Sequence, residues 1–145
     1  MTTVLALINA LIFAFLGGIH IYWMIGGKWG LEQALPMSGG GGKLRVSPGP
    51  LSCIVAASWL WGFALYNVSL VFGFSLGLPL EADQWGIWLL AVIFIFRAIG
   101  DFHYVGMFKK VTNTKFGKMD TKCFIPLCLY LGLSSAWIGW SGIGS

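Results

Sequence analysis

Charged residues interrupt a long apolar segment of the chain in the stretch FRAIGDFHY, residues 96–104. Arg97, Asp101 and His103 stand there among residues that are otherwise mostly apolar or aromatic. A charged side chain at the centre of a bilayer costs roughly 2.5–3.5 kcal/mol on insertion scales, so such residues face a bundle interior, find partners and mark functional sites. The stretch therefore predicts a polar site inside a membrane-embedded fold.

Four segments are long and apolar enough to cross a membrane, at about residues 4–25, 51–78, 85–107 and 123–143. A spanning helix needs about 20 mostly apolar residues. The whole chain is 57% hydrophobic and only 10% charged, which places it outside the range of soluble domains. We therefore predict an all-α membrane protein, a bundle of four transmembrane helices that forms a single domain over residues 1–145.

The distribution of basic residues predicts the orientation of this bundle. Lysine and arginine cluster in the connections 26–50 and 108–122, whereas the connection between the second and third segments carries only Glu81 and Asp83. Positive charge accumulates in the cytoplasmic loops of membrane proteins. The connections 26–50 and 108–122 are thus predicted to be cytoplasmic and both termini to lie outside. This distribution accounts for the net charge of +4 without a nucleic-acid partner.

Helical geometry divides the polar residues of the third segment into two groups. In a helix that continues through residue 104, Arg97, Asp101 and Tyr104 share one face, and His103 points to another side. Arg97 and Asp101 can then form a local ion pair. The pair is either a structural clamp or a site where arginine offers its donors to a carboxylate or phosphate. His20 lies at a similar depth and completes the predicted ligand-binding residues, as a helix contact or a proton carrier.

Weaker candidates for the site are Asn9, Trp23, Asn67 and His103. Asn9 and Asn67 both fall toward the outer side, where they could pair, and Trp23 suits an aromatic belt at the membrane boundary. His20 and His103 raise the alternative of a haem site, but ligation needs both rings aimed at one iron. No other cofactor is predicted. No metal site is predicted either, because no cluster of His, Cys and carboxylate has ligand spacing.

Other residues bear on how the helices pack and begin. Ser69, Gly73 and Gly77 recur every four residues, which is typical of close helix packing and predicts a contact within the bundle or between copies of the chain. Asp120 or Thr121 is expected to cap the fourth helix. Pro126 then falls in its early turns, where a missing N–H matters least.

Several separated motifs carry a family resemblance. They are HIYW at residues 20–23 with Gly26-Gly27, RAIGDF at 97–102 with YVG at 104–106, Phe116, Asp120-Thr121, and PLC at 126–128. The chain resembles a family of small bacterial four-span membrane proteins that is defined only as a domain of unknown function. The resemblance covers nearly the whole chain and implies the bacterial cytoplasmic membrane, but no activity. The family pattern has arginine where His103 stands, which weakens the haem alternative.

These observations predict a small multi-pass protein of the bacterial inner membrane with a binding or accessory-subunit role. Its ligand is expected to be lipid-like or anionic, or else a membrane partner. Two alternatives stay open: an enzyme that acts on a lipid or quinone by acid/base chemistry, and a haem-binding electron carrier. No nucleophile elbow is present, and Asp101 and Asp120 differ in depth, so no enzymatic activity is assigned. Membrane lipids and further copies of the chain are the expected partners.

Overall fold

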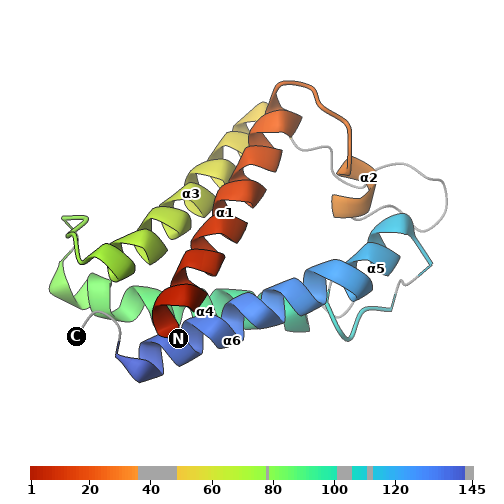
Figure 1. Ribbon diagram of the computed structural model, residues 1–145. Coiled ribbons are helices and arrows are strands. Elements are labelled where there is room, and N and C mark those ends of the chain that lie inside the picture. Colours follow the sequence, from red (N-terminus) through yellow and green to blue (C-terminus); the bar gives the residue numbers. More distant parts are fainter. Residues whose placement is uncertain (36–48, 78, 101–105, 111–112, 143–145) are drawn as a thin grey trace.

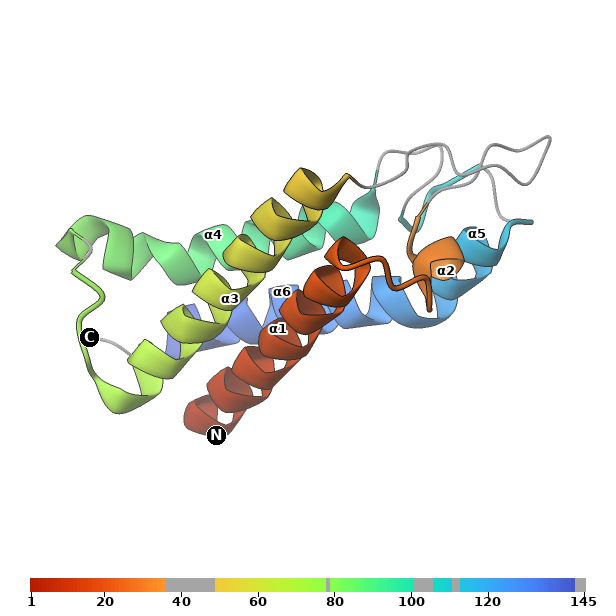
Figure 2. The same ribbon diagram turned by 90° about the horizontal axis from the view of Figure 1, so that it is seen from above.

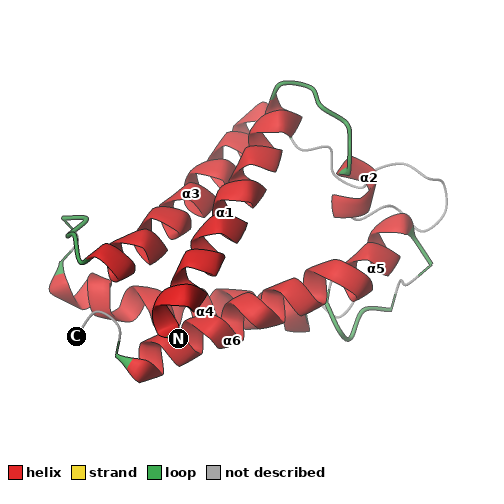
Figure 3. Ribbon diagram, in the orientation of Figure 1, coloured by secondary structure: helices red, strands yellow, loops and turns green. Residues whose placement is uncertain are grey.

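The computed structural model describes residues 1–35, 49–77, 79–100, 106–110 and 113–142, and these residues form helices and connections without a strand (Figures 1 and 3). The fold is therefore all-helical, as predicted. Two short helices and a π-helical turn, η1, accompany four long helices. The elements are α1 (Thr2–Met24), α2 (Leu31–Ala34), α3 (Pro50–Phe72), α4 (Leu80–Ile99), α5 (Lys115–Met119), η1 (Asp120–Phe124) and α6 (Ile125–Ser141).

Three helices in the described part of the chain are long and apolar enough to cross a membrane. They are α1, α3 and the continuous helix Lys115–Ser141, which joins α5, η1 and α6. The apolar part of α4, Trp85–Ile99, is shorter. Large apolar side chains cover the outer surface, such as Leu11, 71% exposed, and Phe96, 67% exposed. An apolar surface of this extent suits lipid rather than water and indicates a membrane protein.

Two helices end earlier than the apolar segments predict. The sequence predicts segments that reach residues 78 and 107, whereas α3 ends at Phe72 and α4 ends at Ile99. Each is followed by a glycine with positive φ: 68° at Gly73 and 82° at Gly100. Glycine adopts this conformation without the steric strain that other residues meet, so it commonly ends helices. The backbone at these two positions therefore sets the helix ends.

The small-residue stripe of the second segment does not form one helical ridge. Ser69 lies within α3, is buried, and donates from Oγ to the carbonyl oxygen of Tyr66 at 2.8 Å. Gly73 and Gly77 both have positive φ and follow the end of α3. The pattern predicts small residues on one continuous helix, whereas only Ser69 stands on it.

The long helices pair as two antiparallel hairpins (Figures 1 and 2). α1 packs along α3, and α4 packs along α6. The hairpins approach each other near the start of α1, where Asn9 meets Ser134, and spread apart toward α2 and α5. The short helices contact each other and connect the hairpins at that end. The core between them comes from all four long helices: Ala6, Phe13, Tyr66, Ile87, Leu90, Leu131 and Ile138.

Candidate functional site around Asp120

Asp120 lies inside a helix rather than at its start. The helix begins at Lys115, and Thr114 caps it by accepting the Gly117 N–H on Oγ1 at 2.9 Å. The predicted capping role of Asp120 or Thr121 is therefore wrong. Asp120 opens the π-helical turn, in which the Ile125 N–H reaches back to the Asp120 carbonyl. A wide turn of this kind precedes Pro126, which has no N–H to donate, and π turns frequently occur at functional sites.

The Asp120 carboxylate binds three groups that come from two other segments. Its side chain is fully buried. Oδ1 accepts a hydrogen bond from Arg97 Nη2 at 3.2 Å. Oδ2 accepts from the Gly106 N–H at 2.9 Å and from Lys109 Nζ at 3.0 Å. Asp120 thus joins the last turn of α4, the connection after it and the following helix.

Lys109 is held entirely by protein groups. Its side chain is only 3% exposed. Besides Asp120, its ammonium group donates to Thr121 Oγ1 at 2.7 Å and to the Gly106 carbonyl at 3.3 Å. Thr121 in turn donates to the Gly117 carbonyl at 3.0 Å. An ammonium group has three donors, so Lys109 is saturated and Lys109–Asp120 is a complete internal ion pair.

Arg97 has donors to spare. Its Nη2 binds Asp120, whereas its Nη1 is buried and has no hydrogen-bond partner. The side chain as a whole is 34% exposed, although Nη1 itself is buried. Among the described residues of this cluster, two cations meet one carboxylate, which leaves one positive charge uncompensated. Nη1 of Arg97 is therefore a donor of the cluster that is left without an acceptor, and guanidinium donors suit the oxygens of an anion.

Gly106 brings the connection back onto the end of α4. The Met107 N–H donates to the Ala98 carbonyl at 3.0 Å. Gly106 has a φ of 95°, and a Cβ atom there would collide with the backbone of Ile99 and Gly100. Only glycine allows both this conformation and this approach. The Gly106 N–H is thereby placed to reach Asp120.

The predicted ion pair between Arg97 and Asp101 depends on a helix that continues through residue 104. α4 ends at Ile99, so that helical face does not extend past Arg97. Asp101, His103 and Tyr104 lie outside the described residues. The partner observed for Arg97 is Asp120, 23 residues away in the sequence.

His20 makes its contacts within α1. Its Nδ1 is 2.8 Å from the Leu16 carbonyl, to which it donates in the corresponding tautomer. Its ring meets that of Trp23 edge-on, with centroids 5.1 Å apart. Trp23 itself donates from Nε1 to the Trp29 carbonyl at 2.9 Å and holds the connection after α1. Neither residue is joined to Arg97 or Asp120 by a hydrogen bond in the part of the chain that the structure describes.

Asn9 and Asn67 form a separate polar position in the core. Both are fully buried. Asn9 Oδ1 accepts from Ser134 Oγ at 3.0 Å, and Asn67 Nδ2 donates to the Phe63 carbonyl at 2.9 Å. No direct hydrogen bond joins the two amides, which differs from the predicted pairing. Within the described residues there is no group of three or more metal-ligating side chains.

The fold and the cluster together define a helical membrane protein with a buried carboxylate held by an arginine and a lysine. Comparison with known proteins then supplies a family. A family model described as "Protein of unknown function (DUF3995)" matches residues 13–135, so the chain belongs to that family. This confirms the family resemblance of the sequence motifs. No curated protein and no solved structure matched the chain.

Proposed function

We propose that the protein is a four-span protein of the bacterial cytoplasmic membrane that binds an anionic lipid headgroup at Arg97. In this proposal α4 is the remaining span, and both termini lie outside. The support for the orientation is that α2, which follows Lys28, and α5, which begins at Lys115, lie at the same end of the bundle and contact each other (Figure 1). Positive charge at one end favours the cytoplasmic side for that end.

The observation that carries the proposal is the buried, unpartnered Nη1 of Arg97. A buried donor without a partner costs about 1–3 kcal/mol, and more for a charged group. A phosphate oxygen that approaches the partly exposed Arg97 side chain would satisfy this donor once the guanidinium turns toward it, and it would balance the second positive charge among the described residues of the cluster. Among the described residues, Lys109 and Arg97 share the single carboxylate of Asp120, so an anionic ligand would balance the second positive charge.

The surroundings of Arg97 favour a lipid over a free anion. Phe96, its neighbour on α4, is exposed, so the position opens beside an apolar surface. The exposed Lys110, Lys118 and Lys122 belong to the same end of the bundle. Each lysine near an anionic leaflet contributes about 1 kcal/mol of attraction. An amphipathic ligand with a phosphate headgroup satisfies both the charge and the apolar surface.

The test compares lipid retention by two variants that remove one positive charge each. Arg97→Gln loses the proposed contact, and Lys110→Gln changes an exposed lysine in the neighbouring connection. Each protein is reconstituted in bilayers of phosphatidylglycerol and phosphatidylcholine, and bound lipids are counted by native mass spectrometry. We expect Arg97→Gln to retain at least tenfold less phosphatidylglycerol than Lys110→Gln, a difference of about 1.4 kcal/mol, because Lys110→Gln loses only the general attraction of one lysine to the leaflet.

Arg97→Lys separates charge from geometry. It keeps the positive charge but loses the planar fork of donors, so intermediate retention is expected. Equal retention by Arg97→Gln and Lys110→Gln, with both proteins folded, would refute the proposal. The accessory-subunit, enzymatic and haem alternatives stay predictions from the sequence, because no contact of the described residues specifically favours them.

A further inference from the structure

Two buried amides in the core leave complementary polar atoms unpaired. Asn9 Nδ2, a donor, and Asn67 Oδ1, an acceptor, each lack a hydrogen-bond partner although both side chains are fully buried. They belong to α1 and α3, which pack along each other. This position is separate from the Asp120 cluster and involves none of its residues.

The packing of α1 against α3 predicts that the two amides lie at the same level. The rings of Phe13 and Phe63 meet with centroids 5.7 Å apart. Asn9 stands one helical turn before Phe13, and Asn67 stands one turn after Phe63. Because the two helices are antiparallel, a step back along α1 and a step forward along α3 go in the same direction. One turn in that direction leads from Phe13 and Phe63 to Asn9 and Asn67.

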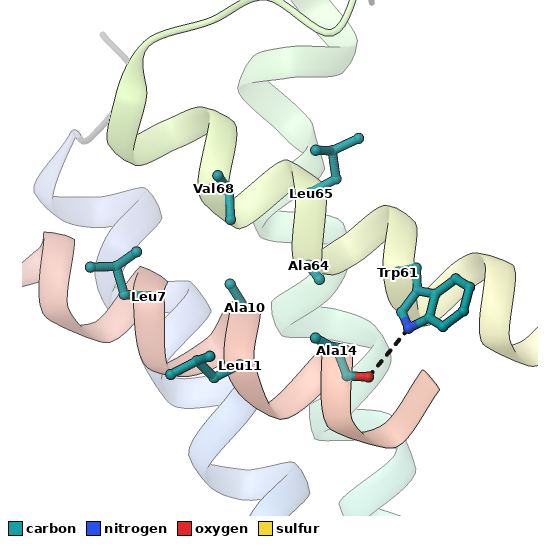
Figure 4. Close-up of a pocket in the computed structure, with 8 residues that line it drawn as sticks. All are labelled: Leu7, Ala10, Leu11, Ala14, Trp61, Ala64, Leu65 and Val68. Atoms are coloured by element: carbon teal, nitrogen blue, oxygen red, sulfur yellow. Dashed lines mark hydrogen bonds between the residues drawn. The ribbon is translucent and has the colours of Figure 1, made fainter. Parts of the chain in front are cut away.

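The outer face of the same helix pair confirms this register (Figure 4). Trp61 donates from Nε1 to the Ala14 carbonyl at 3.2 Å, and Ala14 lies next to Ala64. Ala10 and Val68 lie next to each other one turn further along. These residues line a shallow apolar groove of about 500 Å³. Asn9 and Asn67 directly precede Ala10 and Val68 of this groove in the sequence, but their side chains are buried in the bundle.

We propose that Asn9 and Asn67 bind one water molecule between α1 and α3. The water accepts from Asn9 Nδ2 and donates to Asn67 Oδ1. A buried water typically bridges polar groups of this kind that would otherwise be unsatisfied. The two amides do not bond to each other directly. A bridging molecule that both accepts and donates a hydrogen bond satisfies the Asn9 donor and the Asn67 acceptor.

The bridge also links the two hairpins. Asn9 Oδ1 already accepts from Ser134 of α6, so one amide contacts both neighbours of α1. A bound water on its other side extends this chain of hydrogen bonds from α6 through α1 to α3. The site therefore fixes the level at which the hairpins meet.

The first experiment detects the water directly. Asparagine occurs only at positions 9, 67 and 113, so a nitrogen isotope label in asparagine side chains gives few signals. Solid-state NMR of the full chain in lipid bilayers then measures transfer of magnetisation from water to each amide. We expect an Asn9–water signal in ordinary water and slow exchange of the Asn9 amide protons after transfer into heavy water, whereas the amide protons of Asn113, which is exposed, exchange rapidly. Absence of an Asn9–water signal in the unaltered protein would overturn the proposal.

The second experiment tests whether both amides hold the same water. Asn67→Leu should abolish the Asn9–water signal and leave that of Asn113 unchanged. Melting temperatures of Asn9→Leu, Asn67→Leu and the double variant should be non-additive, because residues in one network couple. We expect the double variant to lose clearly less than the sum of the two single losses. Additive losses, or a persistent water signal in Asn67→Leu, would contradict a shared water.

Discussion

Removal of the Asp120 carboxylate should destabilise the protein severely. Asp120→Ala takes away the acceptor of Arg97, Gly106 and Lys109, at 3.2, 2.9 and 3.0 Å. Lys109 is 3% exposed and cannot reach solvent without disrupting the fold. Loss of one partner from a buried ion pair costs about 3–5 kcal/mol, because the other charge stays buried and uncompensated. A loss of about 4 kcal/mol lowers the ratio of folded to unfolded protein roughly a thousandfold.

Equilibrium unfolding in detergent micelles, followed by circular dichroism, measures this loss. Lys110→Met is the matched control, since Lys110 is exposed and adjacent to Lys109. Its effect should stay within about 0.5 kcal/mol, as for most surface substitutions. If Asp120→Ala and Lys110→Met have similar effects, the buried ion pair does not stabilise the fold as reasoned.

A compensating double variant separates the unpaired charge from the loss of packing. Asp120→Leu combined with Lys109→Met removes both members of the buried pair. Apolar replacement of a whole buried ion pair is often neutral or stabilising. The double variant should therefore recover most of the stability that Asp120→Ala loses. Arg97 remains and loses its contact with Asp120, which limits the recovery.

Two further predictions follow from backbone geometry and exposure. Gly106→Ala should destabilise by at least about 1–3 kcal/mol in the same unfolding assay, because its Cβ would collide with Ile99 and its φ is positive. Gly18→Ala, at a helical position with open space, should instead be neutral or stabilise by roughly 0.5–1 kcal/mol; equal losses for both would contradict the assigned role of Gly106. Cys123, which is exposed, should react with a water-soluble maleimide much faster than the buried Cys128, as seen by mass spectrometry of the labelled peptides. Faster labelling of Cys128 would show that this part of α6 is open.

Hydropathy predicts the long helices well and their ends poorly. α1 spans Thr2–Met24 against a predicted segment of residues 4–25, because a continuous apolar run defines it. α3 and α4 end at glycines with positive φ, and a hydropathy window does not register backbone conformation. Gly73 and Gly100 were visible in the sequence as possible helix ends, yet each is followed by further apolar residues.

The sequence predicts Asp101 as a carboxylate partner of Arg97, and that residue lies outside the described residues; the sequence does not predict the contact with Asp120 that the structure shows. Helical periodicity compares residues on one helix, and Asp120 is 23 residues away on another. The positions of the other acidic residues in the sequence point to Asp120 as a possible partner of Arg97. Glu81 and Asp83 belong to the start of α4, the end opposite Arg97, so Asp120 was one of few carboxylates able to reach the arginine. Its position among lysines made it resemble part of a solvated loop.

Lys109 bears on the choice between a structural clamp and a ligand site. With Arg97 and Asp120 alone, the charges would cancel and the pair would need no ligand. Lys109 donates to the same carboxylate and is fully bonded by protein groups. Arg97 and Lys109 then share the carboxylate. Arg97 has the longer contact and an unpartnered Nη1, so the positive charge of its guanidinium is only partly balanced. A lysine that the positive-inside pattern assigns to the membrane surface is thus buried, and its burial favours anion binding at Arg97.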